Sequence, residues 1–174
     1  MRHLGLALAL ALAPLAACTS GDAGAVPANE VAGAAPATGA GASKTGLIPV
    51  TITSAAGRRT FRVETAVGEE QQQQGLMYRT DIPQDGGMLF YPYPPMGPPR
   101  EASFWMHNTP TSLDIIFIRA DGTIARIAEN TTPFSDVPVA SGEPVAAVLE
   151  VHGGKAAELG VGEGDRVRWP GFPK

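Results

Sequence analysis

The stretch Phe104–Ile118, "FWMHNTPTSLDIIFI", gives the strongest single indication of the fold. Its second half is apolar at consecutive positions, which is typical of a β-strand buried on both faces. One carboxylate, Asp114, interrupts this apolar run. Because burial of an unpaired carboxylate is costly, we expect Asp114 to have a partner. The candidates are the side chain of Arg79, the side chain of His107, and the backbone N–H groups of the turn Asn108–Ser112.

The sequence on both sides of this stretch also predicts β-structure. Asp121-Gly122 lies between two β-rich runs and indicates a hairpin, and residues 47–67 form a second hairpin with alternating polarity. Further strands are expected at residues 87–91, 145–151 and 165–169. Short helices are expected within 68–77, where Gly75 would end the helix, and within 153–160, where Gly160 would end it. The proline-rich segments 91–99 and 131–144 are expected to be extended surface loops. The fold class is therefore mainly β, a sandwich or partly open barrel, with one or two short helices.

The N-terminus has the pattern of a targeting segment. Residues 1–17 combine a basic start with an apolar run too short to cross a bilayer comfortably, which predicts a lipoprotein signal peptide. The end of this run, Leu15-Ala16-Ala17-Cys18, resembles the bacterial lipobox, and Cys18 is the single cysteine of the chain. We expect Cys18 to be lipidated and to anchor the protein to a membrane. The alternative is an ordinary secretory signal that is cleaved after a small residue. By resemblance to the sorting rule of enterobacterial lipoproteins, Thr19 in place of Asp favours the outer membrane, with the protein facing the periplasm.

The mature chain then divides into a tether and a domain. Residues 18–45 are almost all small residues and proline, so we expect a disordered tether. Residues 46–174 have the length of one β-rich domain. Removal of Arg2 with the signal peptide leaves 12 basic against 17 acidic residues, a charge of about −5. This balance argues against nucleic acid as a partner.

No strong catalytic motif is present in the sequence. Lipidation of Cys18 leaves no thiol nucleophile, and the chain has no nucleotide-binding glycine fingerprint and no His-Glu-x-x-His motif. The mature chain has two histidines, His107 and His152, so a zinc site would also need distant carboxylates. We therefore predict no metal and no cofactor. Glu150 is a second acid in an apolar strand, for which pairing with Lys155 or an arginine is the simplest explanation.

Several motifs together resemble the family called domain of unknown function 192. They are "GLMYR" (75–79), "GMLF" (87–90), "FWMHNT…LDIIFI" (104–118), the turn at 121–122 and "VLEVHGGKAAELGVGEGDRV" (148–167). The resemblance implies a small β-rich fold found in bacteria and archaea, often behind a signal peptide or lipobox, and implies no established activity, cofactor or substrate.

Two positions depart from the pattern of this family. His107 stands where the family usually has a basic residue such as Lys, and Ser112 stands where it usually has Pro. A position that accepts Lys is poorly suited to an obligate base or metal ligand. The positions that fit the pattern are taken as candidate binding residues: Arg79, Trp105, Asn108 and Asp114.

Three functions remain open on the sequence. The one favoured is a non-catalytic envelope module that binds a ligand or a protein partner. The second is a structural or assembly factor of the envelope, which a large exposed apolar patch would indicate. The third is a hydrolase of envelope polymers that uses Asp114 and Glu150, which requires both carboxyl groups in one pocket, ~5–10 Å apart.

Overall fold

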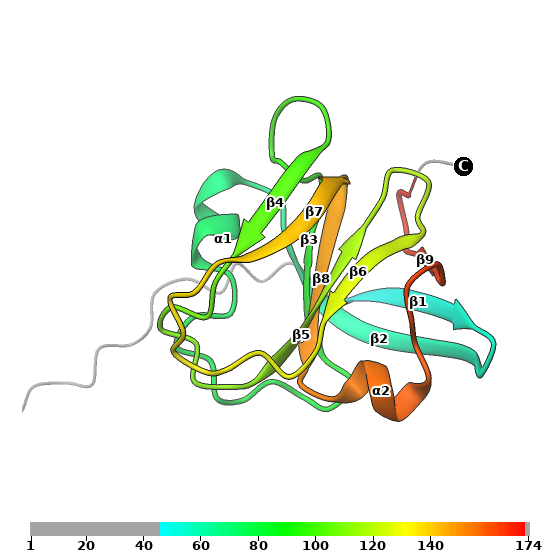
Figure 1. The fold of residues 1–174 in the computed structure, drawn as a ribbon, viewed down its shortest axis with the longest axis horizontal. Helices are drawn as coiled ribbons and strands as arrows, with labels where there is room; N and C mark the ends of the chain where they lie inside the picture. Colours follow the sequence, from blue (N-terminus) through cyan, green and yellow to red (C-terminus); the bar gives the residue numbers. More distant parts are fainter. Residues whose placement is uncertain (1–45, 173–174) are drawn as a thin grey trace, which may run out of the picture. The chain divides into compact units, whose positions relative to one another are not determined.

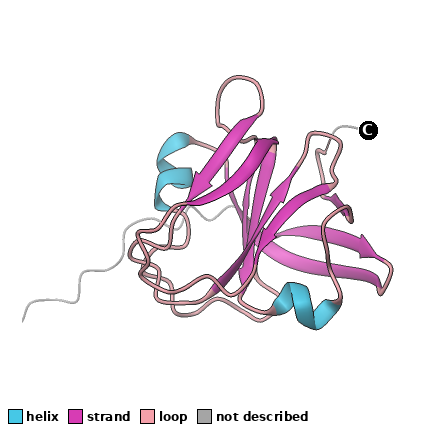
Figure 2. Cartoon of the chain, viewed as in Figure 1, coloured by secondary structure: helices cyan, strands magenta, loops and turns pink. Residues whose placement is uncertain are grey.

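The computed structural model describes residues 46–172, and these form a β-rich domain with two short helices (Figures 1 and 2). The predicted signal peptide, Cys18 and the whole of the predicted tether lie outside the described residues. The elements, in chain order, are β1 (Ile48–Ser54), β2 (Gly57–Ala66), α1 (Glu69–Gln74), β3 (Gly87–Phe90), β4 (Arg100–Phe104), β5 (Leu113–Ile118), β6 (Ile124–Ala128), β7 (Val139–Val145), β8 (Ala147–His152), α2 (Lys155–Leu159) and β9 (Arg166–Arg168). Neither helix is long and apolar enough to cross a membrane.

Seven strands form one curled sheet in the order β6-β5-β8-β3-β2-β1-β9. All neighbours are antiparallel except β2 and β3, which are parallel. The two edges of the sheet approach each other, because Thr123 pairs with Arg166 and the backbone N–H of Ile124 donates to the carbonyl of Asp165 at 2.8 Å. The sheet is therefore a nearly closed barrel. The predicted fold class, mainly β with one or two short helices, is confirmed, and of the two predicted architectures, sandwich and partly open barrel, the structure has the barrel.

The strands β4 and β7 form a separate two-stranded sheet, which crosses in front of the larger one in Figure 1. The prediction of a surface loop over 131–144 is wrong for its C-terminal part, since Val139–Val145 is β7. Gly142 and Pro144 obscured this strand in the sequence. They are tolerated because β7 pairs with β4 alone, so one edge of each strand is left without a ladder.

Two apolar cores lie on opposite faces of the central strands. Alternate residues of β5 and β8 point to each side, which explains why every residue of β5 is buried. The barrel core consists of Val50, Ile52, Phe61, Val63, Leu89, Ile116, Ile118, Ile124, Ala147, Leu149, Val151, Ala156, Val161, Val167 and Trp169. The outer core consists of Ala66, Leu76, Ile82, Met88, Phe90, Ala102, Met106, Leu113, Ile115, Phe117, Val145 and Val148.

Candidate functional site

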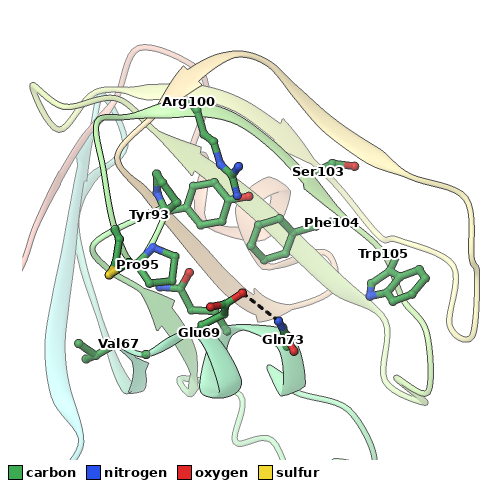
Figure 3. A pocket seen from close by; sticks show the side chains of 13 residues that line it. Val67, Glu69, Gln73, Tyr93, Pro95, Arg100, Ser103, Phe104 and Trp105 are labelled. Carbon is green, nitrogen blue, oxygen red and sulfur yellow. Dashed lines mark hydrogen bonds between the residues drawn. The ribbon is translucent and has the colours of Figure 1, made fainter.

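A groove of about 860 Å³ lies between α1 and the strand β4. Figure 3 shows side chains of α1 along one wall and those of β4 along the other. Its lining consists of Val67, Gly68, Glu69, Gln72, Gln73, Tyr93, Pro94, Pro95, Met96, Arg100, Ser103, Phe104 and Trp105. Ligand sites of proteins are typically concave and apolar with a few polar groups, as this groove is. It is the candidate functional site.

Aromatic rings form one wall of the groove. Phe104 is held by edge contacts with two rings of the outer core, Phe90 at 5.1 Å and Phe117 at 6.1 Å between centroids. Tyr93 packs against Phe104 at 5.6 Å. Trp105 stacks on the ring of His107 at 4.9 Å, yet 51% of its surface is exposed. The wall therefore presents aromatic surface that is held in place and open to a ligand.

The helix α1 supplies the polar wall. Its start is fixed by the side chain of Gln71, whose Oε1 accepts the backbone N–H groups of Val67 at 3.0 Å and Gly68 at 3.2 Å. The Nε2 group of Gln72 donates to the carbonyls of Ala66 at 3.0 Å and Pro92 at 2.8 Å. These bonds tie α1 to the end of β2 and to the proline-rich loop. The glutamine run thus positions the polar side of the groove.

A smaller pocket of about 40 Å³ adjoins the groove and contains Glu150. Gln72, Gln73, Phe104 and Trp105 line both spaces. Glu150 is 4% exposed, and no side chain or backbone group of residues 46–172 makes a hydrogen bond or ion pair with its carboxylate. Burial raises the pKa of this carboxyl group to about 8. Glu150 is therefore an unpaired acid at the inner end of the site.

The expected pairing of Glu150 with Lys155 is wrong. The ammonium group of Lys155 pairs with Glu158 at 2.7 Å, one turn along α2. The sequence placed Glu150 in an apolar strand but gave no sign of what the strand faces. The residues that sequence reasoning missed, Gln72, Tyr93 and Phe104, lie on three separate elements, and only the fold brings them together.

Asp114 lies on the opposite face of the sheet from Glu150. The register pairs Asp114 with Val151 and Glu150 with Ile115, and neighbouring residues of a strand point to opposite faces. The carboxylate pair required by the hydrolase hypothesis is therefore wrong. Asp114 is fully buried and does not line the groove.

The partners of Asp114 are backbone N–H groups, although not those of Asn108–Ser112. Its Oδ1 accepts from Asn130 at 2.8 Å and Gly154 at 2.9 Å, and its Oδ2 accepts from Ala156 at 2.8 Å. The two side-chain candidates are wrong as well, because Arg79 pairs with Glu64 and Asp81, and His107 pairs with Asp136. Asp114 thus joins β5 to the loop after β6 and to the start of α2.

Arg79 and Asn108 lie in adjoining loops outside the groove lining. The Nδ2 group of Asn108 donates to the hydroxyl of Tyr78 at 2.7 Å, and the hydroxyl of Thr111 donates to the carbonyl of Arg79 at 3.0 Å. The hydrogen bond and charge of Asp81 help to raise the pKa of Arg79, so this guanidinium is engaged in ion pairs. Of the four predicted binding residues, Trp105 alone lines the groove.

These loops hold three non-glycine residues in the left-handed region. The φ angles are 63° at Tyr78, 52° at Asn108 and 58° at Phe134. The backbone N–H of Tyr78 donates to Asn108, and that of Phe134 donates to Thr109, so the loops are tied together. Tyr78 and Phe134 are 70% and 64% exposed. Such backbone strain occurs most often at functional sites.

The residues that the structure describes include no cluster of three or more His, Cys, Asp or Glu side chains placed to hold a metal ion.

The model of the family DUF192, described as "Uncharacterized ACR", matches residues 50–169. The chain belongs to this family. The match covers the barrel, the second sheet and both helices, so the groove and Glu150 lie within the DUF192 domain. No curated protein matches the chain.

Two crystal structures resemble the DUF192 domain. A protein of unknown function from Novosphingobium aromaticivorans DSM 12444 is 43% identical and covers 73% of this chain and 89% of its own, with a TM-score of 0.67. A "putative transcription regulator" from Sinorhizobium meliloti 1021 is also 43% identical and covers 70% of this chain and 92% of its own, with a TM-score of 0.65.

Proposed function

We propose that this chain is a lipid-anchored protein of the cell envelope, attached to the outer membrane through Cys18 and facing the periplasm. Its DUF192 domain binds a glycan in the groove between α1 and β4 and does not transform it. The single observation that carries this proposal is the groove itself, which aromatic side chains and the polar side chains of α1 line together. The sequence around Cys18 supports the location.

The chemistry of the groove supports a sugar ligand. Sugar rings have apolar faces that stack on aromatic rings and polar edges that form hydrogen bonds. Trp105 and Phe104 offer such faces, while Gln73, Arg100 and Ser103 offer donors and acceptors along the rim. A binding role is also supported by the placement of Asp114 and Glu150 on opposite faces of the sheet, because this removes the carboxylate pair considered for hydrolysis.

The binding proposal is tested with the soluble chain from Thr19 to Lys174 and chitotetraose, an oligomer of N-acetylglucosamine. Trp105 and Trp169 are the two tryptophans, so Trp169→Phe leaves the fluorescence of Trp105 as a reporter of the groove. We expect chitotetraose to shift this fluorescence, and Trp105→Ala to weaken binding measured by calorimetry at least ~10-fold. Tyr78→Ala removes an exposed ring outside the groove and should leave the affinity unchanged. Absence of binding to the wild type would refute the glycan proposal.

The proposed anchor has its own test. In the full-length protein, Cys18→Ala should move the chain from the membrane fraction to the soluble fraction of the periplasm, because the acyl chains supply the attachment. Retention of the Cys18→Ala protein in the outer membrane would contradict lipid anchoring at this residue.

A structural or assembly role is the second candidate function. The exposed side chains Tyr78, Phe134 and Val137 favour it, since they form apolar surface on the loops. In this case Phe134→Ser would abolish co-purification of an envelope protein with the full-length chain and leave chitotetraose binding intact.

The name of the Sinorhizobium meliloti structure raises regulation of transcription as a further candidate. Four exposed arginines, Arg58, Arg62, Arg166 and Arg168, share the outer face of β2, β1 and β9, and no ion pair involves them within residues 46–172. The excess of acidic residues in the chain opposes DNA binding. Fluorescence anisotropy of a labelled DNA duplex, titrated with the protein at low salt, tests DNA binding. We expect the anisotropy to stay unchanged, and a rise would support a regulator of transcription.

A further inference from the structure

The inner pocket beside Trp105 contains two polar groups without partners within residues 46–172. The carboxyl group of Glu150 is one, as described above. The other is Oε1 of Gln72, which is buried and has no hydrogen-bond partner within residues 46–172. The Nε2 group of Gln72 already donates to two carbonyls, so the amide is fixed in this orientation. Unpaired buried polar groups are rare in proteins and require an explanation.

Part of the wall of this pocket is aromatic and apolar. Phe90, Phe104 and Trp105 line it together with Met77. Its volume of about 40 Å³ is enough for one small polar group and too small for a ring. A ligand group that enters this pocket is therefore the small end of a molecule whose larger part lies in the groove.

We propose that the inner pocket binds the primary ammonium group of an amine ligand whose remaining part lies in the groove between α1 and β4. This inference rests on the proposed function, because it takes the groove as a ligand site. An ammonium group carries three N–H donors and a positive charge. It satisfies both Glu150 and Gln72, and aromatic rings nearby attract cations.

The charges around the pocket are consistent with a cationic ligand. From α1 the lining residues are Gln72, Gln73 and Gln74, all uncharged, and no Lys, Arg or His lines the pocket among the described residues. The residues opposite Glu150 on β3 and β5 are Met88 and Ile115, which are apolar. The charged residues that line the outer groove are Glu69 and Arg100. Glu150 is therefore the one titratable group that lines the described pocket.

Binding of an ammonium group releases a proton. Burial raises the pKa of Glu150 to about 8, so the empty site holds a neutral carboxyl group at pH 7. When the ammonium group enters, the carboxyl group loses its proton to solvent and the carboxylate pairs with the ammonium. The apparent affinity should therefore rise as the pH approaches 8, by up to about tenfold per unit.

The probes are n-butylammonium and 1-butanol, which have the same chain length and differ in charge. They are titrated by calorimetry into the soluble chain from Thr19 to Lys174 at about pH 6, 7 and 8. We expect n-butylammonium to bind at least ~10-fold more tightly than 1-butanol at the highest pH, with proton release that shows in buffers of different ionisation enthalpy. Glu150→Gln should remove the preference, the pH dependence and the proton release. Glu163→Gln, an exposed carboxylate outside the groove and the inner pocket, should leave all three unchanged.

Two outcomes overturn the inference. One is equal affinity of the two probes for the wild type, or no binding of either. The other is an affinity for n-butylammonium that falls as the pH rises. This would mean that the site binds with Glu150 protonated, as a hydrogen-bond donor, and not as the carboxylate partner of an ammonium group. The pH dependence and proton release of the wild type decide the question even if Glu150→Gln does not fold. Chitotetraose binding without n-butylammonium binding would overturn this inference alone, whereas absence of both would overturn the proposed function as well.

Discussion

Two acidic residues on neighbouring strands have opposite environments in this domain. Asp114 accepts three backbone N–H groups, whereas Glu150 has no partner within residues 46–172. A buried carboxylate with three such bonds stabilises the fold, and a buried carboxylate without any costs free energy. We therefore assign Asp114 to the architecture and Glu150 to the site.

Replacement of Asp114 tests the first part of this assignment. Asn at this position keeps one acceptor oxygen and directs an NH₂ group at backbone N–H donors, so at least one bond is lost. We expect Asp114→Asn to lower the free energy of unfolding by about 3 kcal/mol and the melting temperature by roughly 10 °C. The exposed Asp85→Asn serves as control and should change stability by less than ~0.5 kcal/mol. An unchanged melting temperature for Asp114→Asn would contradict an architectural role.

The pH dependence of stability tests the second part. Burial raises the pKa of the Glu150 carboxyl group to about 8 in the folded state, from its ordinary value of 4.5 in the unfolded chain. Between these values the folded state binds more protons, so stability falls as the pH rises from 4.5 to 8 and is then level. We expect the free energy of unfolding of the wild type to fall by a few kcal/mol over this range, and that of Glu150→Gln to lack this fall. Melting temperatures of both proteins from pH 4 to 9 measure it, and parallel curves would contradict the unpaired state of Glu150.

At the scale of elements, the wall of the groove depends on the pairing of β4 with β7. Ser141 joins these strands at a bulge: its Oγ accepts the backbone N–H of Ala102 at 2.9 Å and donates to the carbonyl of Glu143 at 2.7 Å. We expect Ser141→Ala to cost about 1–2 kcal/mol and to speed hydrogen exchange at the Ala102 amide. The exposed Ser103→Ala, on the same pair of strands, should affect neither quantity.

The strand β3 depends on the absence of a side chain at Gly87. A Cβ atom there would overlap the carbonyl oxygen of Glu150 on β8, and Gly87 has a φ of 153°. Because backbone cannot yield as a flexible side chain can, we expect Gly87→Ala to separate β3 from β8 and to cost more than ~3 kcal/mol. Gly162→Ala, where a Cβ would meet open space, should be tolerated. Urea unfolding of both variants gives the comparison.

The sequence predicted elements well where one local signal decides them. The Asp121-Gly122 turn predicted the hairpin of β5 and β6, and the glycines at 75 and 160 predicted the ends of α1 and α2. It failed for β4 and β7, because these short strands pair with each other across about forty residues and contain no clear alternation.

The candidate site was harder to predict than the elements. Trp105 was identified from its motif, but the role of Glu150 depends on which face of the sheet it occupies, and that is set by register with β3 and β5. A shift of one residue would place Glu150 in the barrel core. Tyr93 and Gln72 carry no local signal, since their place in the groove follows from the packing of α1 and the proline-rich loop.

At the scale of the whole domain, β5 and β8 contribute to both cores, so neither core can be exposed without disturbing the other. We therefore expect residues 46–172 to unfold in one cooperative transition. The two tryptophans report on separate faces, because Trp169 belongs to the barrel core and Trp105 lines the groove beside the outer core.

Single-tryptophan variants make this expectation measurable. In Trp169→Phe the fluorescence follows the groove side, and in Trp105→Phe it follows the barrel side. In each variant, the urea midpoint from fluorescence should coincide with the midpoint from far-ultraviolet circular dichroism, because the shared strands couple the two cores. The comparison within one variant removes the effect of the substitution on stability. If the groove side of Trp169→Phe unfolded at a lower urea concentration than its sheet, then α1 and β4 would form a separate, weaker unit, and ligand binding in the groove would be expected to stabilise that unit first.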